Sequence, residues 1–173
     1  EYVYGKYTNT DGVTQNLNGN ASMTLRAPSD AVDVEFADSV TSLPIGVCSD
    51  NTVLTSVTMK SVISIGEGAF SGCTSLSGVN IPSTVTVIGD EAFSGCTSFT
   101  SVDIPSSVAE IGNRVFAGCS NLSTVNMYSI HPPHVGIGVF TQGTITIPQE
   151  ADLEEWKTNY QWRLYAGMII KRS

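Results

Sequence analysis

The sequence contains few charged residues, very few of them basic, and no long apolar run. Lys and Arg number 8 against 16 Asp and Glu, so the formal net charge is -8 at pH 7. This charge repels the phosphates of nucleic acids and anionic membrane surfaces, and nucleic acid is therefore not an expected partner. No stretch of about 18 apolar residues is present, so no membrane insertion is predicted. With 41% hydrophobic residues, the chain can nevertheless bury a core.

Signatures of catalysis and of cofactor binding are also lacking. No G-x-S-x-G elbow, P-loop, G-x-G-x-x-G run or calcium loop occurs, so we predict that the protein is not an enzyme, with no catalytic residues and no cofactor. The 4 cysteines do not form C-x-x-C pairs. His131 and His134 flank Pro132 and Pro133 without a third or fourth ligand beside them, so no metal site is expected.

Internal repeats determine the predicted fold. Segments that begin at Ile65, Ile88 and Ile111 align without gaps at a period of 23 residues. Six positions recur in each segment and are predicted to form the repeat core: Ile65, Ile88 and Ile111; Phe70, Phe93 and Phe116; Cys73, Cys96 and Cys119; Leu76, Phe99 and Leu122; Val79, Val102 and Val125; Ile81, Ile104 and Met127. An earlier copy fits the same slots, with one residue deleted after Met59: Leu43, Cys48, Leu54, Val57 and Met59.

Each repeat carries one short strand that a proline ends. Leu76, Val79 and Ile81 follow L-x-x-L-x-L, in which apolar and polar positions alternate. One strand per repeat must pair with neighbouring repeats, which predicts a parallel sheet along a concave face. The return segment at 89–96 is too short for a long helix and too rich in small residues for a second sheet. One helical or 3₁₀ turn is therefore expected there, with Asp90 near its N-terminus.

The string Ile-Gly, Ala-Phe, Gly-Cys, Leu, Val and Ile-Pro closely resembles the BspA-like leucine-rich-repeat family of bacterial surface proteins. The resemblance covers roughly residues 30–148, with Cys48 and Asn51 at positions where the family usually has Phe and Cys. It implies a leucine-rich-repeat solenoid, an α/β repeat class that is mostly β with short helical or 3₁₀ turns and a C-terminal helical cap.

The same resemblance implies a location and a class of partner. Family members are secreted or lie on the cell surface, which implies a signal peptide or lipid anchor that was removed or lies outside this sequence. They are linked to adhesion to host proteins or to co-aggregation, so the implied partner is a host-matrix or neighbouring-cell protein. A glycan ligand, or a role as a structural spacer that displays another domain, are the alternatives.

Both ends of an open solenoid must be covered. Residues 1–29 are assigned to an N-terminal cap or to the end of a preceding domain, with short strands around the turn at Asp11-Gly12. Residues 30–148 are assigned to the repeats and 149–173 to a C-terminal cap, whose helix is expected at 152–160. Apolar residues are expected to complete that cap: Leu153, Trp156, Tyr160, Trp162, Leu164, Tyr165 and the run 168–170. Sugar stacking on exposed Trp156 and Trp162 is the alternative.

Outward strand positions form the candidate binding face. They are small, polar and nearly uncharged, and they lack the Trp, Tyr and Arg anchors of tight hot spots: Thr55, Ser56, Thr58, Ser77, Gly78, Asn80, Thr100, Ser101, Asp103, Ser123, Thr124 and Asn126. Such a strip can hydrogen-bond a protein or a glycan, and a merely solvated face is the alternative. The repeat cysteines are expected to be buried free thiols, although neighbouring coils lie within disulfide range.

Overall fold

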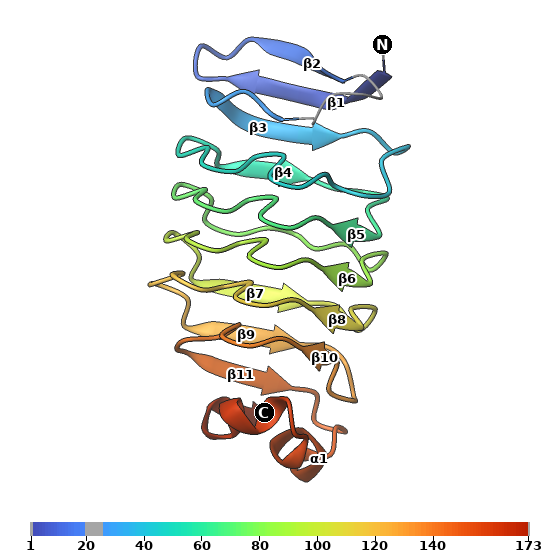
Figure 1. Cartoon of the computed structure of the whole chain (residues 1–173), viewed down its shortest axis with the longest axis vertical. Helices are drawn as coiled ribbons and strands as arrows, with labels where there is room; N and C mark the ends of the chain where they lie inside the picture. Colours follow the sequence, from blue (N-terminus) through green and yellow to red (C-terminus); the bar gives the residue numbers. More distant parts are fainter. Residues whose placement is uncertain (1, 20–25, 173) are drawn as a thin grey trace.

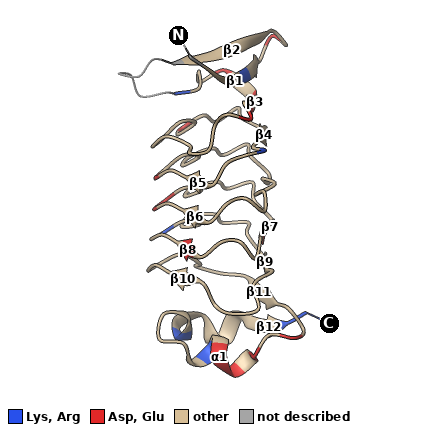
Figure 2. Ribbon diagram, turned by 90° about the vertical axis from the view of Figure 1, so that its right-hand side faces the viewer, with Lys and Arg blue, Asp and Glu red and all other residues tan. Residues whose placement is uncertain are grey.

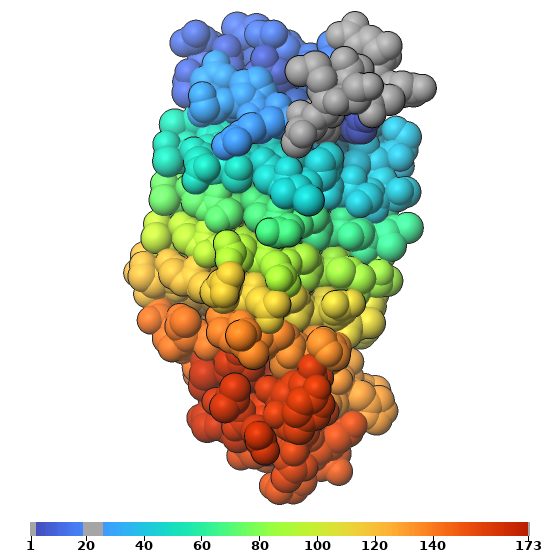
Figure 3. Space-filling view, in the orientation of Figure 1, coloured from blue at the N-terminus to red at the C-terminus, as the bar shows by residue number. Residues whose placement is uncertain are grey.

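The coils of the chain stack into one elongated solenoid (Figure 1). The structure, a computed structural model, describes residues 2–19 and 26–172. An N-terminal hairpin of β1 (Tyr2–Asn9) and β2 (Thr14–Gly19) lies at one end and a small helical segment at the other. Each coil between them forms one layer of side chains in the space-filling view (Figure 3). The division into 1–29, 30–148 and 149–173 stays a prediction.

One side of the solenoid carries the longer strands. β3 (Ala31–Phe36) pairs in parallel with β4 (Ser56–Thr58), and β1 runs antiparallel along the other edge of β3. Further along, β7 (Ser101–Ile104), β9 (Thr124–Met127), β11 (Thr144–Ile147) and β12 (Ile169–Lys171) form a second parallel set. Every coil thus presents its apolar strand positions to one continuous core.

The second coil interrupts this side of the solenoid. The sequence predicts a strand at Val79 and Ile81, yet no strand forms there, and Val79 is half-buried. Gly78 precedes it, and a glycine in a strand has no side chain to pack and loses more backbone entropy on ordering. The expected unbroken sheet therefore consists of two shorter sheets on either side of this coil.

The expectation of one strand per repeat is wrong, because the coils also form short strands on another side of the solenoid. These are β5 (Ser64–Ile65), β6 (Val87–Ile88), β8 (Glu110–Ile111) and β10 (His134–Val135), which pair in parallel. A glycine follows the last residue of each of these strands. A Cβ on Gly89 would lie 2.8 Å from the backbone nitrogen of Glu67, so only glycine allows this approach. The small residues thus permit the second sheet instead of preventing it.

The return segments contain successive β-turns and no helical turn, contrary to the prediction. In the coil at 90–95, Glu91 and Gly95 have φ of 56° and 73°, and such left-handed residues interrupt a helix. They turn the peptide groups toward the neighbouring coil, so that the N–H of Phe93 donates to the carbonyl of Val115 at 3.0 Å. Asp90 caps no helix: its carboxylate accepts from the backbone N–H of Asn113 at 2.7 Å.

A column of aromatic rings runs through the core. The centroids of Phe70 and Phe93 are 5.4 Å apart and those of Phe93 and Phe116 5.6 Å, with nearly parallel rings. The column continues to Phe140, 5.7 Å from Phe116, and then meets Trp162 of the cap. The structure places the other predicted core residues of the repeats in the interior as well, apart from half-buried Val79.

Cys73, Cys96 and Cys119 form a second buried column, and all four cysteines are free thiols. The thiol of Cys96 donates to the carbonyl of Phe70 in the preceding coil at 3.2 Å, and Cys119 donates in the same way to Phe93 at 3.1 Å. Burial raises the pKa of Cys73 to about 12 and that of Cys119 to about 11. Asn51 takes the equivalent place in the first coil and is itself buried. Its side-chain amide donates to the carbonyl of Ala31 at 2.8 Å.

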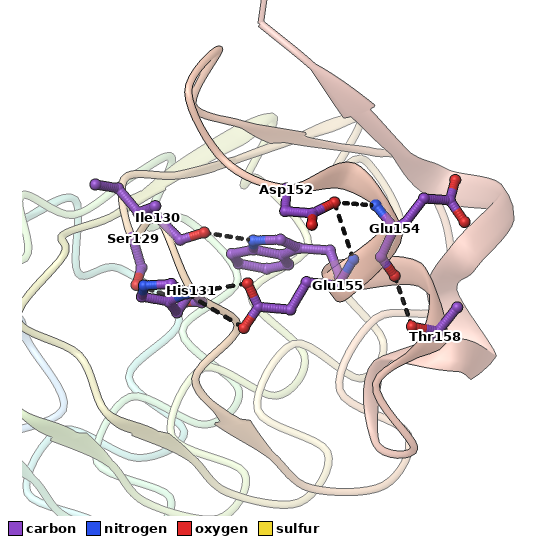
Figure 4. Close-up of polar contacts among 8 residues, drawn as sticks. Ser129, Ile130, His131, Asp152, Glu154, Glu155 and Thr158 are labelled. Atoms are coloured by element: carbon purple, nitrogen blue, oxygen red, sulfur yellow. Dashed lines mark hydrogen bonds and ion pairs between the residues drawn. The ribbon is translucent and has the colours of Figure 1, made fainter.

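The terminal cap, residues 149–172, covers the last coil. Helix α1 (Leu153–Thr158) is shorter than predicted and begins after Asp152, whose carboxylate accepts from the backbone N–H groups of Glu154 and Glu155 (Figure 4). Trp156 and Trp162 are fully buried. Their indole N–H groups donate to the carbonyls of Ile130 at 2.9 Å and Pro133 at 2.6 Å. Their burial contradicts the alternative of sugar-stacking tryptophans.

The predicted roles of Tyr160, Leu164 and Ile170 in the cap are wrong. Tyr160 is 72% and Leu164 74% exposed, and Ile170 also faces outward. The helix ends before Tyr160, and the next segment is a 3₁₀ helix, η1 (Trp162–Met168). With three residues per turn, Trp162 and Tyr165 share its inner face and Leu164 does not. Ile170 alternates with buried Ile169 on β12.

Candidate ligand-binding face

The strand face is the outward surface of β3, β4, β7, β9, β11 and β12. On its C-terminal part, parallel pairing aligns side chains into rows across the strands. Ser101, Thr124 and Thr144 form one row, and Asp103, Asn126 and Thr146 form the next. Neighbouring strands lie about 4.8 Å apart, so side chains within a row are in hydrogen-bonding reach. The row of Asp103 continues on β12 with exposed Ile170.

The second row is a chain of hydrogen bonds. The side-chain amide of Asn126 donates to a carboxylate oxygen of Asp103 at 2.7 Å. The hydroxyl of Thr146 donates to the amide oxygen of Asn126, also at 2.7 Å. These bonds fix the side chains, so little rotamer freedom remains to be lost on binding. Asp103 is exposed, and its carboxylate can accept further bonds.

The structure does not bring all the predicted face residues together. Ser77 and Asn80 lie on the second coil, which has no strand on this side of the solenoid and separates Ser56 and Thr58 from the C-terminal rows. Thr55, Thr100 and Ser123 precede the strands. The hydroxyls of Thr55 and Ser123 donate to the carbonyls of Val32 and Thr100 in the preceding coil at 3.0 and 3.1 Å. These two hydroxyls are engaged in hydrogen bonds between coils, so they are less available to a ligand.

The N-terminal part of the face carries an ion pair. The ammonium of Lys60 lies 3.0 Å from the carboxylate of Glu35. This hydrogen bond lowers the pKa of Glu35 and raises the pKa of Lys60. Both side chains are exposed, so the pair is screened by solvent.

Two residues that the sequence does not single out lie where the strand face meets the cap. Tyr128 follows β9 and Arg172 follows β12, and the guanidinium carbon of Arg172 lies 4.3 Å from the centroid of the Tyr128 ring. With Pro148, Gln149 and Glu150, they line a hollow of about 270 Å³. Alternation along β9 places Tyr128 on the side of Asn126. For Arg172 the sequence gives no such signal, because the pairing of β12 with β11 is not evident from local pattern.

His131, Asp152 and Glu155 make contacts that hold the cap together. The Nδ1 atom of His131 lies 3.0 Å from a carboxylate oxygen of Glu155, which joins the Pro-Pro loop to α1 (Figure 4). Within residues 2–19 and 26–172, no three His, Cys, Asp or Glu side chains gather closely enough to hold a metal ion. In the same part of the chain, no helix is long and apolar enough to cross a membrane.

Stacked coils with an L-x-x-L-x-L strand and an aromatic column define a leucine-rich-repeat solenoid. The chain belongs to a family within this class: residues 33–150 match the BspA type leucine-rich repeat region in six copies. The fold of this family supports an interaction module of the kind found on bacterial surfaces. Among curated proteins, none matches the sequence.

Solved structures of bacterial proteins share this fold. A leucine-rich-repeat protein of T. pallidum is 26% identical, with a TM-score of 0.59 over 69% of this chain and 59% of that one. The pneumococcal vaccine antigen PcpA is 18% identical, with a TM-score of 0.63 over 85% of this chain and 37% of that one. A leucine-rich cell surface protein of Faecalibacterium prausnitzii is 23% identical, with a TM-score of 0.50 over 70% and 37%. The chain thus spans less than two thirds of each.

Proposed function

We propose that this chain is a protein-binding module exposed at a bacterial cell surface, and that it contributes to adhesion. The ligand in this proposal is a protein of the host matrix or of a neighbouring cell. The ligand surface is the C-terminal part of the strand face, from Ser101 to Arg172. The fixed row of Asp103, Asn126 and Thr146 is the observation that carries the proposal.

Three properties of this surface support protein binding. Its polar groups are held by bonds between coils, so binding orders few additional side chains. Parallel rows place polar groups at a regular spacing along the solenoid, which suits an extended ligand segment. Tyr128 and Arg172 add the two residue types that most often anchor interfaces, at the edge of a face that otherwise lacks them.

A protein ligand fits better than a glycan. Both tryptophans of the sequence are fully buried, and the accessible Tyr128 ring has a guanidinium over one of its faces. Sugar rings are usually held by stacking on open aromatic faces. The strand face offers hydrogen bonds and no open stacking platform of this kind.

A pair of matched double variants tests the proposal. Ser101→Lys with Asp103→Lys alters the strand face, and Thr86→Lys with Glu110→Lys makes the same formal charge change on the side of β6 and β8; all four residues are exposed. Each purified chain is immobilised, and its binding to a panel of purified matrix proteins is measured by surface plasmon resonance.

The proposal expects the strand-face variant to bind at least about tenfold more weakly and the control variant to bind like the parent. Thermal melts of both variants should match that of the parent. Equal losses in the two variants would indicate a general charge effect and contradict the proposal. Absence of binding to every protein of the panel would favour the spacer function.

A further inference from the structure

Three contacts hold Arg172 in place. Its backbone N–H donates to the carbonyl of Ile147 at 2.8 Å, in continuation of the pairing between β11 and β12. One terminal nitrogen of its guanidinium donates to the carbonyl of Met127 at 3.2 Å. The guanidinium also packs against the ring of Tyr128. The side chain is therefore positioned before any ligand arrives.

The charge of Arg172 has no carboxylate partner in the described part of the chain. Arg26 is paired with Asp50 and Arg114 with Glu91. Among the described residues, no Asp or Glu oxygen lies within 4.0 Å of the Arg172 guanidinium. One bond to a carbonyl uses one of its five N–H groups. The remaining N–H groups form the planar fork that binds carboxylates with two parallel hydrogen bonds.

The surrounding charge repels an acidic ligand less at this end of the molecule than along the repeats. Residues 149–173 contain four Lys or Arg and four Asp or Glu, so the whole net charge of -8 lies on the first 148 residues. In Figure 2, basic residues mark the end of β12, next to the C-terminus. The repeats therefore repel an acidic group more strongly than residues 149–173 do.

We propose that Tyr128 and Arg172 bind an acidic side chain of the protein ligand, an inference that rests on the proposed protein-binding function. The guanidinium fork of Arg172 receives the carboxylate, and Tyr128 and Gln149, which also line the hollow, carry further hydrogen-bonding groups. Glu150 lines the hollow as well and opposes the incoming negative charge, which limits the affinity. Because Arg172 lies over the Tyr128 ring, this hollow recognises charge and not the face of a sugar.

The test follows the Nε–Hε signals of the four arginines by NMR during titration with the peptide acetyl-Gly-Glu-Gly-amide. The matched peptide with Gln in place of Glu is the uncharged control, and free glucuronate is the sugar control. The Arg172→Gln variant assigns the Arg172 signal. Arg163 is exposed and has no ion-pair partner in the described structure, so its signal reports unspecific anion binding.

The proposal expects a saturable shift of the Arg172 signal with the Glu peptide alone. Arg172→Gln, which retains the melting temperature, should weaken binding of this peptide about tenfold or more. Glu150→Gln should strengthen it about two- to fivefold, and Glu154→Gln on the outer side of α1 should not change it.

Three outcomes would overturn the inference: equal shifts of Arg163 and Arg172, equal shifts with the Gln peptide, or tighter binding of glucuronate than of the Glu peptide. The outcome is separate from that of the Ser101 and Asp103 variant. If that variant loses panel binding while the Arg172 signal stays unchanged by the Glu peptide, only this inference fails. If the panel is silent and the Glu peptide shifts Arg172, the proposed adhesion function fails.

Discussion

Replacement of Phe93 by alanine removes the middle ring of the aromatic column. Phe93 is fully buried and contacts Phe70, Phe116 and Phe99, with centroids 5.4, 5.6 and 5.7 Å away. A buried Phe→Ala change usually costs about 3–5 kcal/mol, and each aromatic pair adds about 0.5–1.5 kcal/mol beyond area. The coils above and below are held apart by their backbone ladders, so the cavity cannot collapse easily. We therefore expect a loss of about 4–5 kcal/mol.

Urea unfolding followed by circular dichroism measures this loss. The melting temperature should fall by roughly 8–20 °C, because 1 kcal/mol corresponds to about 2–4 °C in a chain of this length. Phe93→Leu keeps most of the volume, and we expect it to cost about 1–1.5 kcal/mol as a matched control. A loss below about 1.5 kcal/mol for Phe93→Ala, with an unchanged urea dependence, would refute the role of the column in stability.

Three further predictions follow from the contacts between coils. Gly89→Ala should destabilise the chain by more than about 1 kcal/mol in the same urea assay, because its Cβ would lie 2.8 Å from the backbone of Glu67; a neutral effect would contradict the close packing of β5 and β6. The cysteines, with pKa raised by burial as for Cys73, should resist iodoacetamide at pH 8 until urea unfolds the chain; rapid alkylation of the native protein would contradict their burial. Hydrogen bonds from Asn113 lower the pKa of Asp90 from its ordinary value of 3.8. The Asp90 carboxylate therefore stabilises the fold above pH 3.8. This stabilisation is lost as the pH falls through the pKa that Asp90 has in the folded protein. Asn113→Ala should flatten the fall in urea midpoint between pH 5 and pH 2, and an unchanged slope would contradict the assignment.

The repeat period predicts the features that arise when equivalent positions of successive coils stack. Residues at the same slot stack, so a Phe every 23 residues predicts a buried column and a Cys every 23 residues predicts a second one. The column extends further than the gapless alignment, because Phe140 takes the aromatic slot one coil later. Its spacing from Phe116 differs by one residue, owing to the Pro-Pro loop, and so hides the match.

The small residues of the return segments predict no second sheet, because the effect of glycine on strands depends on what lies opposite it. Small residues weaken an isolated strand, but Gly66, Gly89 and Gly112 face the backbone of the neighbouring coil at distances that exclude a side chain. Their absence of a Cβ is what lets two-residue strands pair. A glycine that recurs at the period of a repeat indicates close backbone approach, and this signal was present in the sequence.

The candidate site was harder to predict because part of it depends on non-local pairing. The polar rows follow from strand alternation, which places Asp103 and Asn126 in register. Tyr128 and Arg172 are distant in sequence and meet only because β12 adds to the edge of β11. The sequence predicts a helix at 152–160 and apolar cover after it, which gives no sign that Ile169–Lys171 form a strand beside the face.

The most direct test of the account places a photo-crosslinking residue on each side of the solenoid. p-Benzoylphenylalanine replaces Ser101 on the strand face or Ala109 on the side of β6 and β8, both exposed positions. Each chain is irradiated with the panel protein that binds the parent most tightly, and covalent adducts are identified by mass spectrometry. The account predicts an adduct from position 101 and none from position 109. An adduct from position 109 alone, or equal adducts from both, would contradict the strand face as the site of protein binding.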